Sequence, residues 1–365
     1  MKTGRRHWAT DLKGSTVLVT GGGGLIGSRI ATLLRELGAR PLSLCRRDAY
    51  PAFVYRELFG VDENDPDVLT GDISDARLVR HAVEQSDYVI HAAALADVAA
   101  CTREPSAAIA GNIMGTQTLL DAVAASDRIR RFCFVSSASV YGNGLRGEPA
   151  CAETRTMRQL LESVYGRMPA VFSEYDRLHP LSVYANSKLW GEFETALSLR
   201  PVGASFVILR YFSVYGEPQI VKQGSHSWVV AWFAARAAIG LPLHLNGGGH
   251  QVRDLVHVDD IAEGTIRALI APRAHGETIN IGTGKPTMIR TVAELTAEHF
   301  PDVKTLQTPM PPGDPEGGYA ATGHMLTTLN WVPQVSVADG VARYAAWLKQ
   351  TPQAVPAWLR QPTAA

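Results

Sequence analysis

Hydrophobic positions in the first 140 residues alternate between short β-branched runs and longer stretches with helical periodicity. The short runs predict buried strands at residues 17–20, 41–44, 68–73, 88–94 and 132–137. The periodic stretches predict helices at residues 25–37, 75–85 and 107–125. Because strands and helices alternate, we expect a doubly wound α/β fold with a parallel sheet and right-handed crossovers.

The pattern changes beyond residue 215. Helices are expected at residues 228–239, 291–300 and 337–348, with a strand at 243–245 before a glycine turn. We therefore expect a mainly dinucleotide-binding domain over residues 14–215 with an insertion at 151–178, and a smaller mixed α/β lobe, mainly a substrate lobe, over residues 216–350. Some exchange of chain between the two is expected, with tails at residues 1–13 (flexible) and 351–365. The insertion, with a possible helix at 157–165, either covers a substrate pocket or runs over the surface.

Composition narrows the class of protein. The chain has 365 residues, 46% hydrophobic and 19% charged, with a net charge of zero. Zero net charge gives no support for a nucleic-acid or membrane-surface partner. The longest apolar run, residues 228–245, is interrupted by Arg236 and Pro242, which favours a buried helix over a membrane span. Four cysteines without Cys-x-x-Cys spacing predict reduced thiols in a cytoplasmic protein, with neither disulfide nor metal site.

A glycine cluster after the first strand carries the first chemical signal. Gly21 permits a tight turn, Gly24 lets the backbone approach a pyrophosphate, and Gly27 allows close packing of helix and strand. The helix that follows, beginning Leu25-Ile26, offers free N–H groups and a partial positive charge to phosphates. Strand, loop and helix stand in the required order, which predicts a Rossmann-type dinucleotide site.

The end of the second strand bears on the choice of cofactor. An NAD site has an acid there that binds the adenosine ribose. This chain instead has Cys45, followed by Arg46 and Arg47. We therefore expect NADP(H), with the two guanidinium groups ready to pair with its 2′-phosphate. The alternatives are a solvated arginine pair on a loop and the use of NAD.

The fourth expected strand ends in His91, Ala92 and Ala93. The small alanine side chains allow a cofactor to lie against the backbone. His91 has two interpretations, a catalytic base or a packed core histidine at a strand end. We favour the core histidine.

The fifth expected strand ends in Ser136-Ser137, and Tyr184 and Lys188 follow later, four residues apart. That spacing places Tyr184 and Lys188 on one helix face. A tyrosine hydroxyl is a poor base at neutral pH, and we expect the neighbouring ammonium to lower its pKa. Such a tyrosine exchanges a proton with an alcohol or ketone, while a serine hydroxyl holds the same oxygen. A surface Tyr/Lys pair is the alternative.

From about Ser15 to Leu348 the chain resembles the extended short-chain dehydrogenase/reductases that act on nucleotide-diphosphate sugars. Further motifs carry this resemblance beside the glycine loop and the Ser-Tyr-Lys set: Gly71-Asp72-Ile73, Asn112 in Asn112-Ile113-Met114-Gly115-Thr116, Leu209 to Gly216, Arg253 to Asp260, Asn280-Ile281-Gly282-Thr283-Gly284, and Trp331-x-Pro333.

The resemblance implies roles for individual residues. Ser137, Tyr184 and Lys188 are the catalytic set, with Tyr184 as acid/base. The implied cofactor contacts are Gly21, Gly24, Leu25, Ile26, Gly27, Arg46, Arg47, Asp72, Ile73, Ala92, Ala93, Asn112, Tyr184, Lys188 and Tyr211. The implied substrate contacts are Ser137, Ser139, Ser213 and Arg253, with Arg253 on a phosphate or, alternatively, paired with Asp254. A homodimer through the helices at 107–125 and 184–199 is also implied.

The chain departs from the family pattern at two places. The dehydratases it resembles have an Asp-Glu pair after the catalytic residue, and the decarboxylases have Glu at the second position. Ala138 and Ser139 stand there, so both reactions are disfavoured. Ser213 replaces a common Asn.

Three functions follow from these observations. We expect an NADP(H)-dependent ketoreductase acting at C4 of a nucleotide-diphosphate-linked deoxysugar. The alternative is an NAD-dependent 4-epimerase of such a sugar. A non-catalytic NADP-binding regulator is disfavoured by the intact Ser-Tyr-Lys set.

Overall fold

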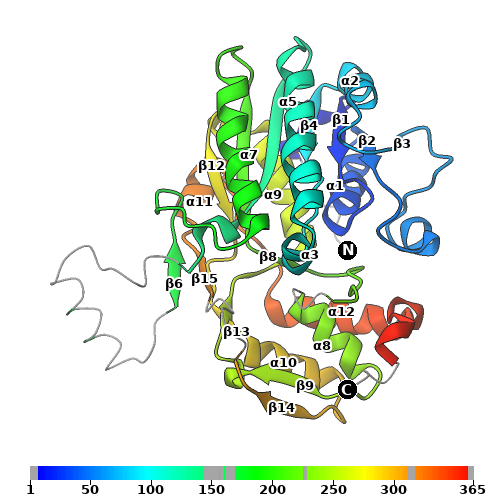
Figure 1. The fold of residues 1–365 in the computed structure, drawn as a ribbon, viewed down its shortest axis with the longest axis vertical. Helices are drawn as coiled ribbons and strands as arrows, with labels where there is room; N and C mark the ends of the chain where they lie inside the picture. The colour runs from blue at the N-terminus through cyan, green and yellow to red at the C-terminus, as the bar shows by residue number, and fades with distance from the viewer. Residues whose placement is uncertain are drawn as a thin grey trace.

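The structure is a computed structural model that describes residues 7–143, 169–224, 228–310 and 317–360, together with Thr156 and Leu160. Figure 1 shows a large sheet flanked by helices above a smaller lobe. Most of the expected insertion at 151–178, all of its possible helix at 157–165 except Leu160, and Cys151 lie outside the described residues.

The large sheet has seven strands, and every neighbouring pair is parallel. Their order across the sheet is β12 (Thr278–Ile281), β7 (Phe206–Tyr211), β5 (Arg131–Ser137), β4 (Tyr88–His91), β1 (Thr16–Thr20), β2 (Arg40–Cys45) and β3 (Val68–Thr70). Strand order reverses between β1 and β4, and ligands bind at such a switch point at the carboxyl ends of the strands.

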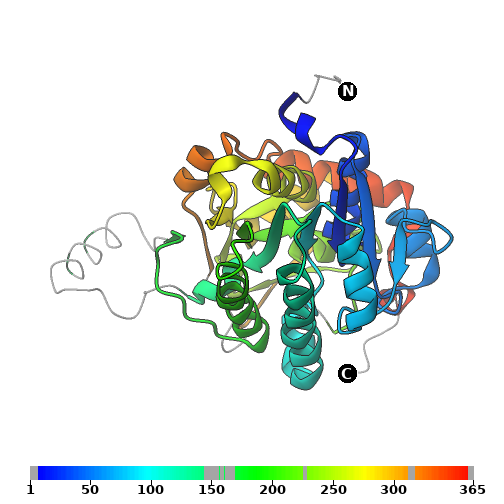
Figure 2. The ribbon, with the colours of Figure 1, turned by 90° about the horizontal axis from the view of Figure 1, so that it is seen from above.

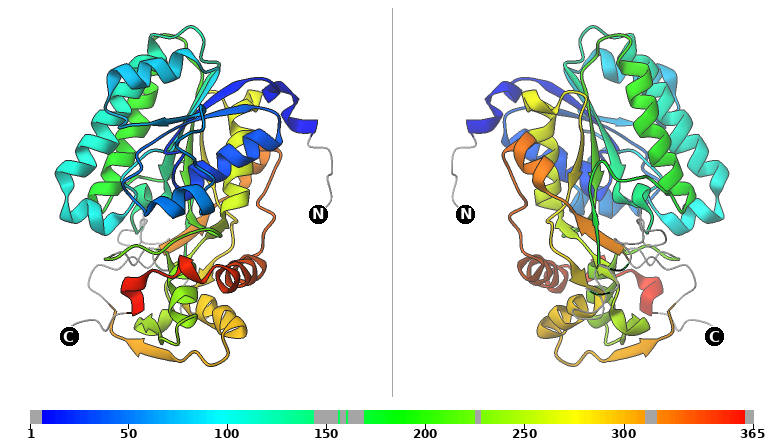
Figure 3. Two further views of the ribbon diagram at one scale, coloured as in Figure 1. Left: turned by 90° about the vertical axis from the view of Figure 1, so that its right-hand side faces the viewer. Right: turned by 90° about the vertical axis from the view of Figure 1, so that its left-hand side faces the viewer.

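Helices cover both faces of this sheet (Figure 3), which confirms the doubly wound α/β fold. One layer contains α2 (Ala76–Glu84), α5 (Gly115–Ala124) and α7 (Val183–Leu199). The opposite layer contains α1 (Leu25–Glu36) and α9 (Val258–Ile270), with α11 (Gly323–Leu329) beside them. Burial on both faces explains why β1 is apolar at consecutive positions and buried throughout.

The chain around Asn112 differs from its expected form. Residues 107–125 were predicted as one helix, but the structure has α4 (Pro105–Ala108), a π-helical turn (Ile109–Met114) and then α5. The wide turn coincides with bonds from the Asn112 side chain to the backbone of Leu95, after β4. Such π turns are common at functional sites.

The smaller lobe combines helices with short strands. Its helices are α8 (Val229–Ala237), α10 (Ile289–His299) and α12 (Val337–Gln350), and β9 (Leu243–Asn246) pairs with β14 (Thr305–Thr308). A four-stranded sheet lies beside it in the order β13 (Thr287–Met288), β10 (Val252–Arg253), β15 (Gly317–Ala320) and β6 (Ala170–Phe172). The strands β8 (Ser213–Tyr215) and β11 (Leu255–His257) pair with each other between the two parts.

Both expected tails contain ordered structure. A 3-10 helix, His7–Leu12, packs against α9 and buries Leu12 completely, so residues 7–12 are not a flexible tail. Short helices at Pro352–Ala354 and Ala357–Arg360 follow α12. There Trp358 stacks on Trp232 of α8, with ring centroids 6.3 Å apart. Figure 2 shows the helix His7–Leu12, in dark blue, beside the large sheet.

Two further expectations concern membranes and thiols. In the part of the chain that the structure describes, no helix combines the length and apolar character needed to cross a bilayer. Cys45, Cys101 and Cys133 are buried free thiols.

Candidate active site

The glycine loop between β1 and α1 lies against the end of β4. Gly21 has φ +74°, and a Cβ there would lie 2.8 Å from the Ala93 nitrogen. A Cβ on Gly27 would lie 2.2 Å from the Gly21 oxygen. Gly24 is the N-cap of α1 without a side-chain cap, so the first helical N–H groups have no side-chain acceptor there. Leu25 and Ile26 begin the helix. This cradle fits the diphosphate of a dinucleotide.

His91 is a core residue, as favoured from the sequence. Its Nδ1 lies 2.7 Å from Thr20 Oγ1 and its Nε2 lies 2.8 Å from Thr116 Oγ1. Complete burial lowers the pKa of His91 to about 3. A neutral ring held at both nitrogens packs the carboxyl end of β4 and is not a base for catalysis.

The arginines after β2 are not free, which corrects the expectation that they stand ready for a 2′-phosphate. Arg46 forms ion pairs with Asp48 and with Asp72, whose Oδ2 lies 3.2 Å from Nη1. Arg47 pairs with Glu63. The Arg46 hydrogen bond holds the Asp48 pKa below its ordinary value, so this carboxyl stays ionised. The expected ribose end of the crevice therefore has two carboxylates around one guanidinium.

Asp72 and Ile73, which follow β3, have different surroundings. Asp72 accepts hydrogen bonds from the nitrogen and hydroxyl of Ser74, which hold its carboxylate beside Arg46. The Ile73 side chain packs inward, since a Cβ on Gly115 would lie 2.3 Å from its Cγ2. The Ile73 side chain therefore belongs to the core between sheet and α5.

Ser137 and Tyr184 come together at the end of β5. Ser137 is the N-cap of a short 3-10 helix, Ala138–Tyr141, and its Oγ accepts a hydrogen bond from the Ser139 nitrogen at 3.2 Å. The Ser137 side chain lies close enough to the Tyr184 hydroxyl to lower the pKa of Tyr184. Tyr184 lies in the first turn of α7, where Ser182 caps the helix through the Ala185 nitrogen.

Lys188 does not lower the pKa of Tyr184 as expected. Burial raises the Tyr184 pKa to about 12, and the nearby Ser137 side chain opposes that effect only in part. Lys188 Nζ donates to the Val135 oxygen at 2.8 Å and lies 6.0 Å from the centre of the Tyr184 ring. Burial lowers the pKa of Lys188 to about 8. Without a ligand, Tyr184 therefore keeps its proton at neutral pH.

Two predicted cofactor contacts have internal partners. Asn112 accepts from the Leu95 nitrogen at 2.7 Å and donates to the Ser187 hydroxyl at 3.0 Å, between Tyr184 and Lys188. The Tyr211 hydroxyl bonds to Thr265 on α9. Asn112 therefore positions the loop after β4 against α7, and the Tyr211 side chain is part of the core.

A buried ion pair behind the catalytic set was not anticipated from the sequence. Glu192 accepts from Nε and Nη2 of Arg210 at 2.9 and 2.6 Å, and from the Ser136 hydroxyl at 2.5 Å. Glu192 follows Lys188 by four residues, which repeats the spacing of Lys188 from Tyr184. That repeat was the signal in the sequence, since it places all three side chains along one helix stripe.

The predicted substrate residues Ser139, Ser213 and Arg253 lie on three short elements, the 3-10 helix after β5, β8 and β10. Ser139 Oγ is buried, and within the described ranges it has no hydrogen-bond partner. The Ser213 nitrogen donates to the Asp254 oxygen across the β8–β11 pair. Arg253 donates to the Val252 oxygen at 2.8 Å.

Asp254 does not serve as the ion-pair partner considered for Arg253. Its carboxylate accepts from the backbone nitrogens of Thr283, Gly284 and Ala320 at 2.8 to 3.0 Å. Burial raises the pKa of Asp254 although these bonds oppose it. Asp254 therefore ties β10 to the loop after β12, and it leaves the guanidinium of Arg253 to other partners.

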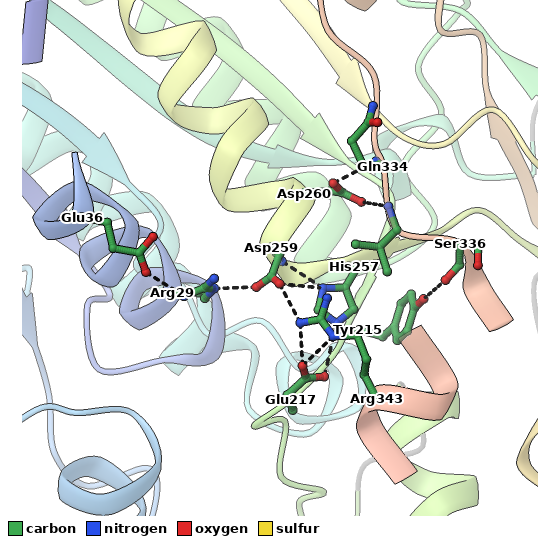
Figure 4. A network of polar contacts seen from close by, with 11 residues as sticks. Arg29, Glu36, Tyr215, Glu217, His257, Asp259, Asp260, Gln334, Ser336 and Arg343 are labelled. Carbon is green, nitrogen blue, oxygen red and sulfur yellow. Dashed lines mark hydrogen bonds and ion pairs between the residues drawn. The ribbon is translucent and has the colours of Figure 1, made fainter. Parts of the chain in front are cut away.

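A polar network joins α1 to the smaller lobe (Figure 4). Arg29 of α1 donates to Asp259 Oδ1 at 2.5 Å, and Arg343 of α12 donates to Asp259 Oδ2 at 2.7 Å. Arg343 also binds Glu217, which lies 3.3 Å from Nε2 of the buried His257. The helix that begins at the glycine loop is thus tied to residues on both sides of the crevice.

The chain matches a known protein family over most of its length. The model of the NAD dependent epimerase/dehydratase family matches residues 17–160 and 161–282. A UDP-glucose 4-epimerase from Azospirillum brasilense is 29% identical over 368 residues, covering 93% of this chain and 93% of the relative.

Two solved structures have a similar overall fold. A UDP-glucose 4-epimerase from Thermotoga maritima, solved with UDP-glucose, has a TM-score of 0.78 and 26% identity, covering 92% of this chain and 99% of its own. A UDP-glucose 4-epimerase from Thermus thermophilus, solved with NAD, has a TM-score of 0.72 and 28% identity, with the same coverage of both chains.

Proposed function

Since the chain belongs to the NAD dependent epimerase/dehydratase family, we propose that it is an NAD-dependent 4-epimerase of a nucleotide-diphosphate sugar. A UDP-hexose is the first substrate to test, because the relatives described above are UDP-glucose 4-epimerases. This proposal replaces the NADP(H)-dependent ketoreductase as the preferred function.

The observation that carries the proposal is the environment of Arg46. Asp48 and Asp72 both bind its guanidinium, so two carboxylates already share this positive charge. A 2′-phosphate would have to displace a carboxylate and would meet like charge. A ribose 2′-hydroxyl can instead donate a hydrogen bond to one of these carboxylates. This favours NAD, and a 4-epimerase needs no external reductant.

The site residues support a reversible proton transfer. NAD held on the glycine loop would supply the hydride acceptor and donor for the sugar carbon. Tyr184 exchanges a proton with the sugar oxygen, and the Ser137 hydroxyl, which lies beside Tyr184, holds that oxygen. A positive charge brought into the crevice favours the phenolate form of Tyr184, whose pKa is raised by burial.

Two neutral side chains argue against water elimination. Ala138 and Ser139 occupy the short helix after Ser137, where a dehydratase needs an acid and a base. Ser139 contributes only a buried hydroxyl, which is neither an acid nor a base at neutral pH. A reaction that moves one hydride and one proton is compatible with these residues, whereas loss of water lacks its catalysts.

The test begins with nucleotide released from the purified, denatured protein. Stoichiometric NAD in the supernatant, followed by interconversion of UDP-glucose and UDP-galactose without net change in NADH absorbance, is the expected result. Protein that carries no NAD and oxidises NADPH with 4-keto sugar nucleotides would contradict the proposal and restore the ketoreductase. Other uridine and thymidine diphosphate sugars extend the assay to define the substrate.

We also propose that the protein is a homodimer through α5 and α7. The two helices lie side by side (Figure 1). Large apolar side chains on them are exposed, among them Phe193 (60%), Leu197 (67%) and, at the end of the preceding π turn, Met114 (57%). A second copy of the same face would bury these side chains.

A further inference from the structure

Residues 216–224, which we call the crossing segment, leave β8 and lead towards α8 of the smaller lobe. Side chains from other elements hold both ends of this segment. Near its start, Glu217 binds Arg343 of α12. At its end, Arg103 of α3 (Val98–Arg103) donates to the Gly224 oxygen at 3.3 Å. These anchors tie the segment to α12 of the smaller lobe and to α3, which follows β4 at the switch point of the sheet.

Lys222 of the crossing segment is connected to the glycine loop by a series of ring contacts. Its Nζ lies 4.2 Å from the centre of the Tyr50 ring. The Tyr50 and Tyr55 rings meet edge to face with centroids 5.8 Å apart. A Cβ on Gly23 would lie 3.2 Å from Cε1 of Tyr55. The ammonium group is therefore two rings away from the loop that fits a diphosphate.

Two carboxylates lie near the ammonium group of Lys222. Asp48, after β2, and Asp97, after β4, both act on its ammonium group. In the sheet, β1 and its glycine loop lie between β2 and β4, so these two carboxylates follow the strands on either side of the loop. Asp97 is 8% exposed and its Oδ2 has no hydrogen-bond partner in the described part of the chain. Burial lowers the pKa of Lys222 although both carboxylates raise it.

We propose that Lys222 is a cofactor-binding residue whose ammonium group pairs with the diphosphate of the dinucleotide. The proposal rests on the dinucleotide of the proposed function and not on the reaction. Asp48 and Asp97 follow the strands on either side of the glycine loop, and Lys222 is a cation on which both carboxylates act. An ion pair with hydrogen bonds is stronger than contact with a tyrosine ring, so the flexible stem moves from Tyr50 to the phosphates. The crossing segment then couples the cofactor to the smaller lobe.

The test compares Lys222→Met with Lys349→Met by calorimetric titration. Lys349 is a matched control, since its Nζ lies 5.0 Å over the Phe300 ring of the lobe. Nucleotide carried through purification is removed first, and its amount is recorded as a second readout. We expect Lys222→Met to weaken ADP-ribose binding by about tenfold or more, the effect of one charge-assisted bond. Adenosine binding should be unchanged, and Lys349→Met should bind both ligands as the unsubstituted protein does.

Several results would overturn the assignment. Equal losses for ADP-ribose and adenosine would show that Lys222 acts only through Tyr50, and unchanged ADP-ribose binding would show no role. A loss confined to 2′-AMP would assign Lys222 to a 2′-phosphate instead. Lys222→Arg, which keeps the charge, should retain most of the affinity, so the test holds even where the methionine variant folds poorly. Failure of the unsubstituted protein to bind ADP-ribose would reject the cofactor, whereas absence of epimerase activity with normal binding would reject only the reaction.

Discussion

Glu192 and Arg210 form a two-pronged ion pair in which each side chain is 5% exposed. The pair joins α7 to β7, and the Ser136 hydroxyl adds β5 to the same carboxylate. Because α7 also carries Tyr184 and Lys188, this contact fixes the helix of these proposed catalytic residues against the strand that carries Ser137. Precise placement of reacting groups contributes strongly to catalysis.

Glu192→Gln should therefore destabilise the protein strongly. The substitution leaves the buried guanidinium of Arg210 without its charge partner, which costs about 3–5 kcal/mol. Denaturation by urea measures the loss. Glu263→Gln on α9 is the control, because its partner Arg267 lies four residues away in a pair more open to solvent, worth about 1 kcal/mol or less. Losses of similar size in the two variants would contradict the structural role of Glu192.

Tyr184→Phe should abolish most of the epimerase activity and leave cofactor binding intact. Removing an acid/base hydroxyl lowers the rate by about 10²- to 10⁴-fold. The measurements are turnover of the sugar nucleotide and the amount of NAD released on denaturation. Tyr175→Phe is a suitable control, since Tyr175 is 85% exposed. Normal turnover of Tyr184→Phe would remove Tyr184 from the mechanism.

Lys188 should make the stability of the ligand-free protein depend on pH. Burial lowers its pKa from 10.5 to about 8, whereas the unfolded chain keeps the proton up to about pH 10.5. The unfolded state therefore binds more protons between these values, and stability rises with pH across this window. The Lys188 contribution changes by about 3 kcal/mol over this range.

The difference in melting temperature between the unsubstituted protein and Lys188→Met isolates this contribution. From pH 8 upwards, the melting temperature of the unsubstituted protein should rise relative to that of Lys188→Met. Below pH 8 the difference should be constant. A difference that stays flat from pH 7 to pH 10 would show that Lys188 is not titrating in the buried state.

Asp48→Asn should shift the cofactor preference towards NADP. The substitution removes a carboxylate from Arg46 and leaves the guanidinium freer to bind a 2′-phosphate. We expect the ratio of NADP to NAD affinity to rise by about tenfold, the effect of one charge-assisted pair. Asp62→Asn on the same connection is the control, because the Asp62 carboxylate accepts its hydrogen bonds from Asn64. An unchanged ratio in the Asp48 variant would remove Asp48 from cofactor selection.

The double substitution Phe193→Asp with Leu197→Asp should convert the protein to monomers. Both side chains are exposed on α7, one turn apart, and two charges there oppose burial against a second copy. Light scattering after size-exclusion chromatography measures the mass. Leu306→Asp on β14 places a charge on an exposed position of the lobe and should leave the dimer intact. A monomeric unsubstituted protein would contradict the dimer directly.

The large sheet could be predicted because its signals are local. Each strand is an apolar run, and the glycines that follow β1 have a fixed spacing relative to strand and helix. The short strands β10 and β13, two residues each, left no such pattern. These strands depend on contacts between residues around Asp254 and segments about 30 residues later in the chain, such as Thr283 and β13. Contacts between distant parts of a sequence leave no local periodicity.

In the candidate site, too, the features with a local signal in the sequence could be predicted, and those that depend on the whole fold could not. Spacing alone placed Tyr184 and Lys188 on one helix face, and β5 brought Ser137 to them. The sequence displayed the charge of Arg46 but not its partners, since Asp72 follows another strand. The effect of burial on Tyr184 was also missed, because the surroundings of a side chain depend on the whole fold.

The apolar core of the smaller lobe also includes residues of the dinucleotide-binding part. Cys45, Val54 and Tyr55 from that part pack in one cluster with Leu255 and Tyr344. The two parts therefore share cohesive energy and should unfold in a single cooperative transition. A fragment ending after β8 would expose this surface to water and also lack β12 at the sheet edge. During synthesis on the ribosome, the part of the chain that contains the glycine loop therefore cannot complete its folding until α12 has been synthesised.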